Sequence, residues 1–345
     1  MISIVIPTYN HAKFLPIALA SIMRQGPCIS RIIVVNDGST DETTSLLAEL
    51  QSKDPRIQYI NLPHNVGQLP ALSIGFRYVD TEFFAFAAAD DYLLPGWAEA
   101  CSNALQSAPG AGLCLSRTFM VNEASGNITK SAIPWTLRGK TLKPDDFLQS
   151  LLRYGNWFSS NTVLYRRKTF DESIFEFPSA GAFYDGLTIS MLGLKNGVTD
   201  VDAPLGVFLV RQSSISGATA APKIGVQLLN ELSAILLRVD RPPIRSRKLV
   251  SRMIRRNTYI YIIGAVAEVT SQYAQFAINH LPNIISTALR ISLGLGLVLY
   301  KISIFISLRP FDLLQAGRRA SVSATLNERH DLSEYRKALN NSLSS

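Results

Sequence analysis

Short apolar runs alternate with segments of helical character through the first hundred residues, and this alternation limits the fold more than any other feature of the chain. Continuous apolar runs are typical of strands that are buried on both faces of a parallel sheet. They lie at Ile2 to Ile6, Arg31 to Val35, Ile57 to Asn61 and from Phe83 onward. The order strand, helix, strand, helix predicts an α/β fold with a mostly parallel sheet.

Polar residues follow three of these runs, at the ends where ligands bind in open α/β sheets. They are Pro7 to Asn10 after the first run, Asn36 to Asp41 after the second, and Asp90 and Asp91 after the last. The Asp90-Asp91 pair suits a hard divalent cation such as Mg²⁺ or Mn²⁺, which takes oxygen ligands. The alternative interpretation is that the pair only turns the chain before Pro95.

Two helices are expected between the strands. Ser39 followed three residues later by Glu42 reads as a capping box that opens a helix toward Leu50. A second helix is expected through Ala71 to Tyr78, after the loop at residues 64–67. Each strand is thus predicted to enter a helix through a short polar turn.

Four segments in this order resemble the inverting family 2 glycosyltransferases. The segments are IVIPTYNHAKFLPIALASI, IIVVNDGSTDET, HNVG and AADDYLLPG. The resemblance covers roughly residues 1 to 215 and implies the GT-A, nucleotide-diphospho-sugar transferase fold, a Rossmann-like, mostly parallel central sheet flanked by helices. It implies a glycosyltransferase domain at residues 1–220 and gives no argument for the remainder. The residue pattern of 221–345 predicts a mainly α-helical region, with a polar tail from about residue 318.

The resemblance also implies the donor-binding residues. Those expected around the nucleotide are Pro7, Thr8, Tyr9, Asn10, Asp37, Asn65 and Gly67. Among them Asp37 would accept a hydrogen bond from a base N–H, and Tyr9 would stack on the base or simply pack. For Asn65 and Gly67 an ordinary turn is the alternative.

The same comparison assigns roles to the carboxylate pair. Asp90 matches the carboxylate that contacts the ribose, and Asp91 matches the one that coordinates the metal bridging the diphosphate. Many relatives carry another Asp two positions before Asp90, whereas this chain has Ala88. The last two carboxylates remain, and the resemblance therefore implies Mg²⁺ or Mn²⁺ as cofactor.

Asp185 is the expected general base. In the family this base lies in an acidic motif that begins a helix, usually Glu-Asp, and the best match here is Tyr184-Asp185. Periodic apolar residues after Asp185 predict a helix that ends at Gly197. The alternative is that Asp185 only caps this helix.

Three features concern the acceptor and the closing side of the site. Trp157 is a candidate platform for a sugar ring, with ordinary packing as its alternative. The basic triplet Arg166 to Lys168 is expected to be solvated or to face an acceptor phosphate. Arg211 would meet the diphosphate or be an exposed strand-end residue.

In relatives, the segment that matches Val210 to Ser216 often carries a histidine near the metal. The four histidines of this chain, at positions 11, 64, 280 and 330, lie outside that segment.

The C-terminal third differs in charge. Residues 1–220 hold 17 Lys and Arg against 19 Asp and Glu, whereas residues 221–345 hold 17 against 7, a net charge of +10. The segment Arg238 to Arg256 is strongly basic and apolar stretches follow it, which predicts attachment to an anionic membrane face. The alternatives are a soluble helical module that forms a homodimer and a true span, which needs about 20 apolar residues. Nucleic-acid binding is not expected, because no recognised module accompanies the basic segment.

The resemblance implies an enzyme that moves a sugar from a nucleotide-diphosphate donor, with UDP as the nucleotide, to an acceptor hydroxyl. Together with the basic, apolar C-terminal region it implies a lipid-linked saccharide acceptor in cell-surface polysaccharide synthesis. The alternatives are transfer to a polyprenyl phosphate and a catalytically silent nucleotide-sugar-binding membrane scaffold. Three cysteines without zinc spacing and an N-terminus without a cleavable segment predict a cytoplasmic protein, peripherally attached to the inner face of the plasma membrane.

Overall fold

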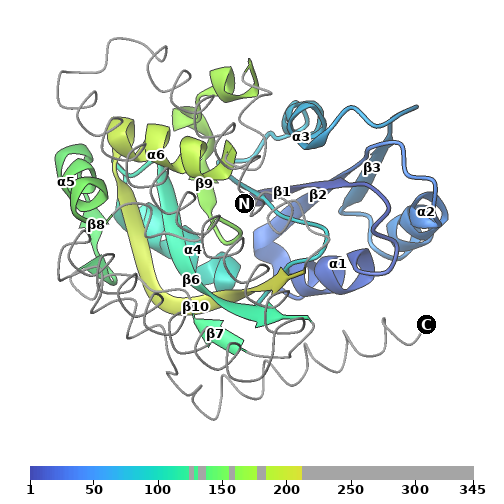
Figure 1. The fold of residues 1–345 in the computed structure, drawn as a ribbon, viewed down its shortest axis with the longest axis horizontal. Coiled ribbons are helices and arrows are strands. Elements are labelled where there is room, and N and C mark those ends of the chain that lie inside the picture. The colour runs from blue at the N-terminus through green and yellow to red at the C-terminus, as the bar shows by residue number, and fades with distance from the viewer. Residues whose placement is uncertain (124–127, 131–136, 155–159, 177–183, 212–345) are drawn as a thin grey trace, which may run out of the picture. The chain divides into compact units, whose positions relative to one another are not determined.

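The computed structural model describes residues 1–123, 128–130, 137–154, 160–176 and 184–211. All of these lie in one compact unit (Figure 1). Trp157, residues 213–216 and the predicted basic and apolar C-terminal region lie outside the described residues.

Within the described residues, ten strands form one mixed sheet. They are β1 (Ile2–Thr8), β2 (Ile29–Asn36), β3 (Ile57–Asn61), β4 (Phe83–Phe86), β5 (Tyr92–Leu93), β6 (Leu113–Asn122), β7 (Ile128–Lys130), β8 (Thr141–Leu142), β9 (Leu164–Arg166) and β10 (Val198–Val210). The order is β3-β2-β1-β4-β9-β6-β10-β5, with β7 beside β6 and β8 beside β10. The first four strands in this order are parallel, as the sequence predicts, and β9 runs antiparallel to both β4 and β6.

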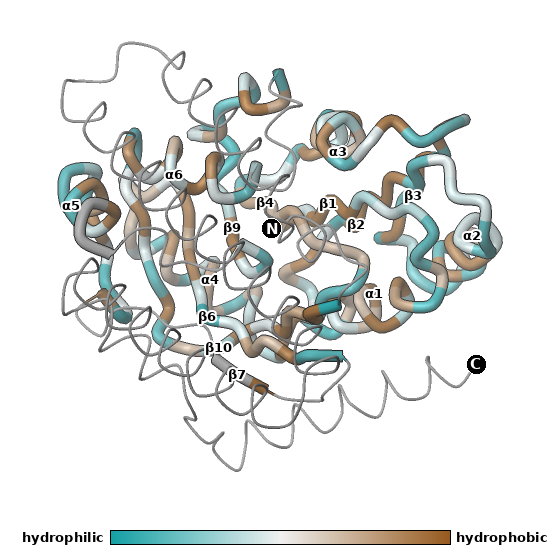
Figure 2. Tube along the Cα trace, viewed as in Figure 1, coloured by the Kyte–Doolittle hydropathy of each residue, from teal (hydrophilic) through white to brown (hydrophobic). Residues whose placement is uncertain are grey.

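Helices connect and cover the strands. They are α1 (Leu15–Met23), α2 (Thr43–Lys53), α3 (Gln68–Phe76), α4 (Trp97–Ser107), α5 (Pro144–Tyr154) and α6 (Tyr184–Asn196), with the short 3₁₀ turns η1 (Gly26–Cys28), η3 (Arg167–Thr169) and η4 (Glu172–Glu176). Hydrophobic residues gather along the central strands, whereas hydrophilic residues gather on the outer helix α2 and the loops near β3 (Figure 2). Among the described residues, no helix has both the length and the apolar character that a membrane span needs.

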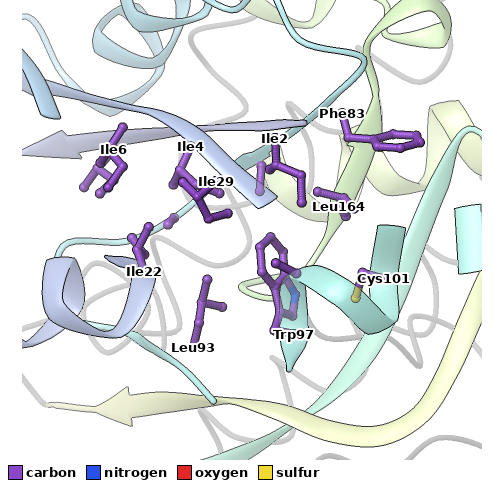
Figure 3. Packing of buried hydrophobic residues seen from close by; sticks show 14 of the residues in the cluster. Ile2, Ile4, Ile6, Ile22, Ile29, Phe83, Leu93, Trp97, Cys101 and Leu164 are labelled. Carbon is purple, nitrogen blue, oxygen red and sulfur yellow. The ribbon is translucent and has the colours of Figure 1, made fainter. Parts of the chain in front are cut away.

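Successive residues of β1 face opposite layers, as the two-residue period of a strand requires. On one face Ile4 and Ile6 pack with Ile22 of α1 and with the fully buried Trp97 of α4 (Figure 3). Figure 1 shows α1 and α3 on opposite sides of the strands β1 and β2. The sheet is therefore a central layer between two layers of helices.

On the other face, α3 approaches the sheet closely because it presents a glycine. A Cβ on Gly75 would lie 2.4 Å from Val5 Cγ1 and 3.0 Å from Val35 Cγ2. Beside it Phe84 of β4 stacks on Tyr165 of β9, with ring centroids 5.3 Å apart. These contacts fix the ends of β1, β2 and β4 relative to one another, and those ends carry the predicted donor residues.

Two local predictions were wrong. The helix α2 begins at Thr43, later than the predicted capping box, because Asp41 Oδ1 accepts hydrogen bonds from both the amide and the hydroxyl of Thr43. The strand β4 ends at Phe86, so the two carboxylates stand on a turn beyond it rather than directly at its end.

Candidate active site

The predicted donor residues lie at one edge of the sheet, where β1, β2 and β4 end. Thr8 pairs in register with Asn36, and Val5 pairs with Phe86. The strand order reverses between β1 and β4, because β2 and β3 lie on one side of β1 and β4 on the other. In open α/β sheets this reversal point is where ligands bind.

Asp37 joins two of the predicted loops. Its Oδ1 accepts a hydrogen bond from the Val66 amide at 2.7 Å, and its Oδ2 accepts one from the Gly67 amide at 3.0 Å. Asp37 is only 3% exposed. The structure thus brings Asp37, Asn65 and Gly67 together, as predicted, and gives Asp37 a task that the sequence did not indicate. A carboxylate has about four acceptor positions, so Asp37 can still accept a hydrogen bond from an N–H group of a nucleotide base.

The residue after Asp37 must be glycine. Gly38 has φ +70°, and a Cβ there would lie 2.5 Å from the carbonyl carbon of His64 and 2.7 Å from the amide nitrogen of Asn65. The loop at 64–67 therefore lies directly on the backbone of Gly38. This close approach explains why the motif after β2 contains glycine at position 38.

The loop after β1 is tied to the loop after β2. Asn10 has a left-handed backbone, φ 55°, and its amide donates to Ser39 Oγ at 2.9 Å, while its Oδ1 accepts from the Thr40 amide at 2.8 Å. The Ala12 amide donates to Asp41 Oδ2 at 3.1 Å. The side chain of Asn10 is thus occupied in holding the loops.

The rest of the Pro7 to Asn10 turn differs in exposure. Thr8 is buried, Pro7 is half-buried and Tyr9 is 43% exposed. Tyr9 is therefore open to a planar ligand, and whether it stacks on the base stays a prediction.

Asp90 pairs with Arg211 at the end of β10. The Arg211 guanidinium forms an ion pair with Asp90 Oδ2 and lies over the ring of Phe14, 4.3 Å from its centroid. Arg211 is 9% exposed, so the interpretation as an exposed strand-end residue was wrong. Asp90 is half-buried and reaches the same region as the loop after β1.

Asp91 points in a different direction from its neighbour. It is buried, its Oδ1 accepts from the Leu209 amide at 3.4 Å, and the side chain of Asn161 donates to it. Burial, and then the negative charge of Asp90, raise the pKa of Asp91 well above its ordinary value. Asp91 is thus anchored to β10 and to the segment before β9.

Asp185 stands in the first turn of α6, as predicted. The hydroxyls of Tyr184 and Ser160 donate to its carboxylate. Burial raises the pKa of Asp185 to about 6, while the two hydroxyl donors act in the opposite direction. The charge of Asp185 also helps to raise the pKa of Asp91, so the two carboxylates lie within electrostatic range of each other. Gly197, with φ +79°, follows the end of this helix.

Sequence reasoning missed three residues of this site. Ser160 and Asn161 contact Asp185 and Asp91, and they come from a segment without a recognisable motif. His11 lies beside the ring of Phe14, and its buried Nδ1 has no hydrogen-bond partner among the described residues. Burial lowers the pKa of His11, against the opposing effect of Asp90. Only its position directly after the turn at 7–10 could have indicated it.

The basic triplet is not a solvated helix start throughout. Arg166 is 4% exposed and lies in β9, where its guanidinium donates to the carbonyls of Leu105 and Ala111 and pairs with Glu82. Arg167 and Lys168 are exposed. Arg166 is therefore a structural residue, which corrects the prediction for that position.

The described residues contain no group of three or more His, Cys, Asp or Glu side chains that could hold a metal ion. Mg²⁺ is usually bound by one or two carboxylates together with the phosphates of a substrate, rather than by a complete protein cage. The Asp90-Asp91 turn, with one half-buried carboxylate beside a cation, fits that donor set.

Comparisons with known proteins identify the family and the fold. The model of glycosyl transferase family 2 matches residues 3–174. The chain belongs to glycosyl transferase family 2, through a domain that contains the predicted donor motifs.

A curated relative is the GalNAc(5)-diNAcBac-PP-undecaprenol beta-1,3-glucosyltransferase of Campylobacter jejuni, which is 31% identical over 182 residues, 50% of this chain and 56% of that protein. This chain spans between 13% and 61% of the length of the first curated relatives that it matches.

Two solved structures show the same fold. One is TarS 1-349 of S. aureus in complex with UDP-GlcNAc, with TM-score 0.56, 16% identity and coverage of 78% of this chain and 80% of that one. The other is the mannosyltransferase PcManGT of Pyrobaculum calidifontis in complex with GDP-Man and Mn²⁺, with TM-score 0.54, 17% identity and coverage of 91% and 84%. The fold is therefore the Rossmann-like GT-A fold that the motifs imply.

Proposed function

We propose that this chain is an inverting glycosyltransferase that moves a sugar from a nucleotide-diphosphate donor to an acceptor hydroxyl. The observation that carries the proposal is Asp185, a carboxylate at a helix start whose pKa is raised to about 6, within electrostatic range of the Asp90-Asp91 turn. A general base works best when its pKa lies near the operating pH.

In this mechanism Asp185 accepts the proton of the acceptor hydroxyl as its oxygen attacks the anomeric carbon. The bond from that carbon to the diphosphate oxygen breaks, and the nucleoside diphosphate leaves with the bonding electrons. A single displacement inverts the anomeric configuration. Arg211, which is held over Phe14, supplies a fixed positive charge toward the departing diphosphate.

A bound Mg²⁺ or Mn²⁺ would neutralise charge on the leaving group. We propose that Asp90 faces this ion, in place of the role predicted for Asp91. Asp90 is half-buried, whereas Asp91 is buried against the Leu209 amide and Asn161. Asp91 then holds the turn in position.

The donor side is proposed to hold a nucleotide in the loops at Pro7 to Asn10, Asp37 and residues 65–67. A UDP-sugar is the preferred donor, which the family and the fold shared with TarS in complex with UDP-GlcNAc support. The base contacts proposed for Asp37 and Tyr9 remain compatible with their burial and exposure.

The acceptor is proposed to be a lipid-linked saccharide. The name of the Campylobacter relative contains a diphospho-undecaprenol group, and residues 221–345 of this chain carry a net charge of +10. We propose that residues 1–220 form the catalytic domain and that the remaining region attaches to an anionic membrane surface or pairs with a second copy.

The proposal is tested by nucleoside diphosphate release from UDP-, GDP- and dTDP-sugars with Mn²⁺ or Mg²⁺, with and without a bacterial lipid extract. The proteins are wild type, Asp90→Ala, Asp185→Asn and the control Asp145→Asn, which changes an exposed acid in the first turn of α5. Release that needs metal, extract, Asp90 and Asp185, but not Asp145, is the expected result. Donor binding without release under every condition would overturn the proposal in favour of a silent binding protein.

The same variants separate two acceptor chemistries. A polyprenyl phosphate is already anionic and needs no base, so Asp185→Asn should then lose little turnover. A hydroxyl acceptor should lose about 10²–10⁴-fold, the usual contribution of a general base. A loss of less than about tenfold would favour the phosphate acceptor.

A further inference from the structure

The turn at Asp90-Asp91 continues into a segment that is held from two sides. On one side β5 pairs with β10, and the Leu94 amide donates to the carbonyl of Leu205 at 2.9 Å. On the other side β5 contacts α1, the helix that follows the donor loop at residues 7–10. The backbone beyond the two carboxylates therefore lies between a strand and a helix.

Two side chains near the C-terminal end of α1 bind this segment. Ser21 Oγ accepts a hydrogen bond from the Leu93 amide at 3.1 Å, and Gln25 Nε2 donates to the carbonyl of Leu94 at 3.0 Å. Gln25 Oε1 accepts from the Ala98 amide at 3.2 Å. Ser21 is 1% exposed, and Gln25 is half-buried. The end of α1 therefore holds backbone groups at both ends of the segment 93–98.

Gln25 supplies a cap that α4 does not have in its own sequence. The first amides of a helix lack partners within the helix, and the N-cap side chain usually accepts from one of them. Here the N-cap is Gly96, with φ 85°, which has no side chain. The amide of Ala98, the second residue of α4, finds its acceptor on Gln25, 73 positions earlier. The start of α4 and the end of α1 are thus joined through one carboxamide.

The opposite end of α1 also reaches the surroundings of the two carboxylates. Phe14 directly precedes α1, and Arg211 Cζ lies 4.3 Å from the centroid of its ring. Arg211 in turn pairs with Asp90. The loop before Phe14 is tied to the loop after β2, because the Ala12 amide donates to Asp41 Oδ2 at 3.1 Å. The helix α1 therefore connects the donor loops with the acidic turn through contacts at both of its ends.

We propose that Gln25 is a positioning residue for the transfer reaction, which together with Ser21 fixes the Asp90-Asp91 turn at one distance from the donor loops. This inference rests on the proposed function, because that function places Asp90 on the side of the departing diphosphate. Gln25 acts through the backbone of residues 93–98 and does not itself touch the reacting atoms. A misplacement of about 1 Å at an active site can cost about 100-fold in rate, so a residue that only holds a turn can matter for turnover.

The test compares Gln25→Ala with the control Gln51→Ala. Gln51 is also a glutamine whose Nε2 donates to a backbone carbonyl, that of Ile57 at 3.1 Å, but it lies in α2 outside the site. Ser21→Ala is the second variant, which tests the same segment if Gln25→Ala does not fold. For each protein we measure turnover by nucleoside diphosphate release, urea unfolding, and the Kd of UDP, GDP and dTDP by calorimetry with Mg²⁺.

We expect Gln25→Ala to raise the Kd of the nucleotide that binds best by about 5–10-fold and to lower turnover by about 10–100-fold. Gln51→Ala should leave both values within about twofold of wild type. When Asp90 is already alanine, Gln25→Ala should change the Kd by less than about twofold, because a residue that acts through another is not additive with it.

Unchanged Kd and turnover in folded Gln25→Ala would overturn the inference. The same increase in Kd with and without the Asp90 carboxylate would also overturn it, because Gln25 would then act on the fold in general. If Gln25→Ala does not fold, the same comparison with Ser21→Ala decides between these outcomes.

Failure of this inference is distinguishable from failure of the proposed function. If wild type releases no nucleoside diphosphate from any donor, the proposed function fails and the role of Gln25 fails with it. If wild type is active and Asp90→Ala raises the nucleotide Kd, whereas Gln25→Ala keeps the wild-type Kd and turnover, only the positioning role is refuted.

Discussion

The donor loops and the surroundings of Asp185 are held together in opposite ways. Between the loops, backbone amides donate to side-chain oxygens, as at Asp37 and Asn10. Around Asp185 the donors are side-chain hydroxyls, and beside it Asn161 donates a side-chain amide to Asp91. Backbone donors stay in place when a side chain is replaced, whereas a side-chain donor disappears with the residue that carries it.

This difference in hydrogen-bond donors predicts that the donor loops and the surroundings of Asp185 control different properties of the enzyme. A change in the donor loops alters the shape of a backbone surface, and it should act on donor affinity and on stability. A change around Asp185 alters the orientation and ionisation of one carboxylate, and it should act on turnover and its pH dependence. The predictions below test this division, beginning with the largest effect.

Arg166 should be needed for stability on the Asp185 side. Its guanidinium donates to the carbonyls of Leu105 at 2.6 Å and Ala111 at 3.1 Å, and Arg166→Met would remove a charged donor from each, with the Ala108 amide still donating to Leu105. We expect a loss of about 3 kcal/mol in the free energy of unfolding, measured by urea denaturation. The exposed Lys168→Met should change it by less than about 0.5 kcal/mol. Equal losses in the free energy of unfolding for Arg166→Met and Lys168→Met would contradict the structural role of the buried Arg166.

Gly38 should be intolerant of a side chain for two reasons, strain and collision. Gly38→Ala places a Cβ 2.5 Å from the His64 backbone, whereas Gly26→Ala, at φ +79°, meets no atom within 4 Å. We expect about 1 kcal/mol of destabilisation at Gly26 and at least about 2 kcal/mol at Gly38, by thermal or urea unfolding. Donor Kd should rise only for Gly38→Ala. A similar cost at both positions would mean that the loop at 64–67 shifts without penalty.

Asp37→Asn should weaken donor binding more than it weakens the fold. The amide group keeps one acceptor oxygen, so one of the Val66 and Gly67 amides would face an N–H₂ group. Losing one such bond costs about 1–2 kcal/mol, or roughly a 5–30-fold increase in donor Kd by calorimetry. Asp80→Asn breaks only a surface pair with Arg31 and should leave Kd unchanged. An unchanged donor Kd in Asp37→Asn would show that the loop at residues 64–67 is not part of the donor site.

The pH dependence of turnover should report Asp185. Its pKa is raised to about 6, and the base must be ionised, so turnover should be full above this value and fall as the pH decreases through it. The measurement is kcat for nucleoside diphosphate release between pH 4.5 and 8. A half-maximum near pH 4, the ordinary carboxyl value, would indicate a different base or a rate-limiting step elsewhere.

The positions of the donor loops were largely predictable from the sequence, although the hydrogen bonds between them join residues 29 or 30 positions apart. The motifs at residues 7–10, 37–41 and 64–67 each follow a strand, and parallel strands bring their carboxyl ends together. The contact between Asp37 and the Val66 and Gly67 amides follows the expected proximity. The capping box at Ser39 was wrong because Ser39 Oγ accepts from the Asn10 amide and Asp41 accepts from the Thr43 amide, choices that spacing alone does not decide.

The Asp185 side was predictable only at Asp185 itself. The residue Ser160, which helps to lower the pKa of Asp185, comes from a loop that is distant in sequence. Arg166 was misread because a run of basic residues usually indicates solvent, whereas its acceptors are carbonyls 55 to 61 residues earlier in the chain. Long-range contacts of single side chains carry no local pattern.

The most direct test of the proposed mechanism is donor Kd and turnover measured together on Asp185→Asn, with the lipid extract as acceptor source. The account predicts a donor Kd within about twofold of wild type and a fall in turnover of at least about 100-fold, because Asp185 is assigned to the acceptor proton alone. A loss of donor affinity as large as the loss of turnover, or unchanged turnover, would contradict it.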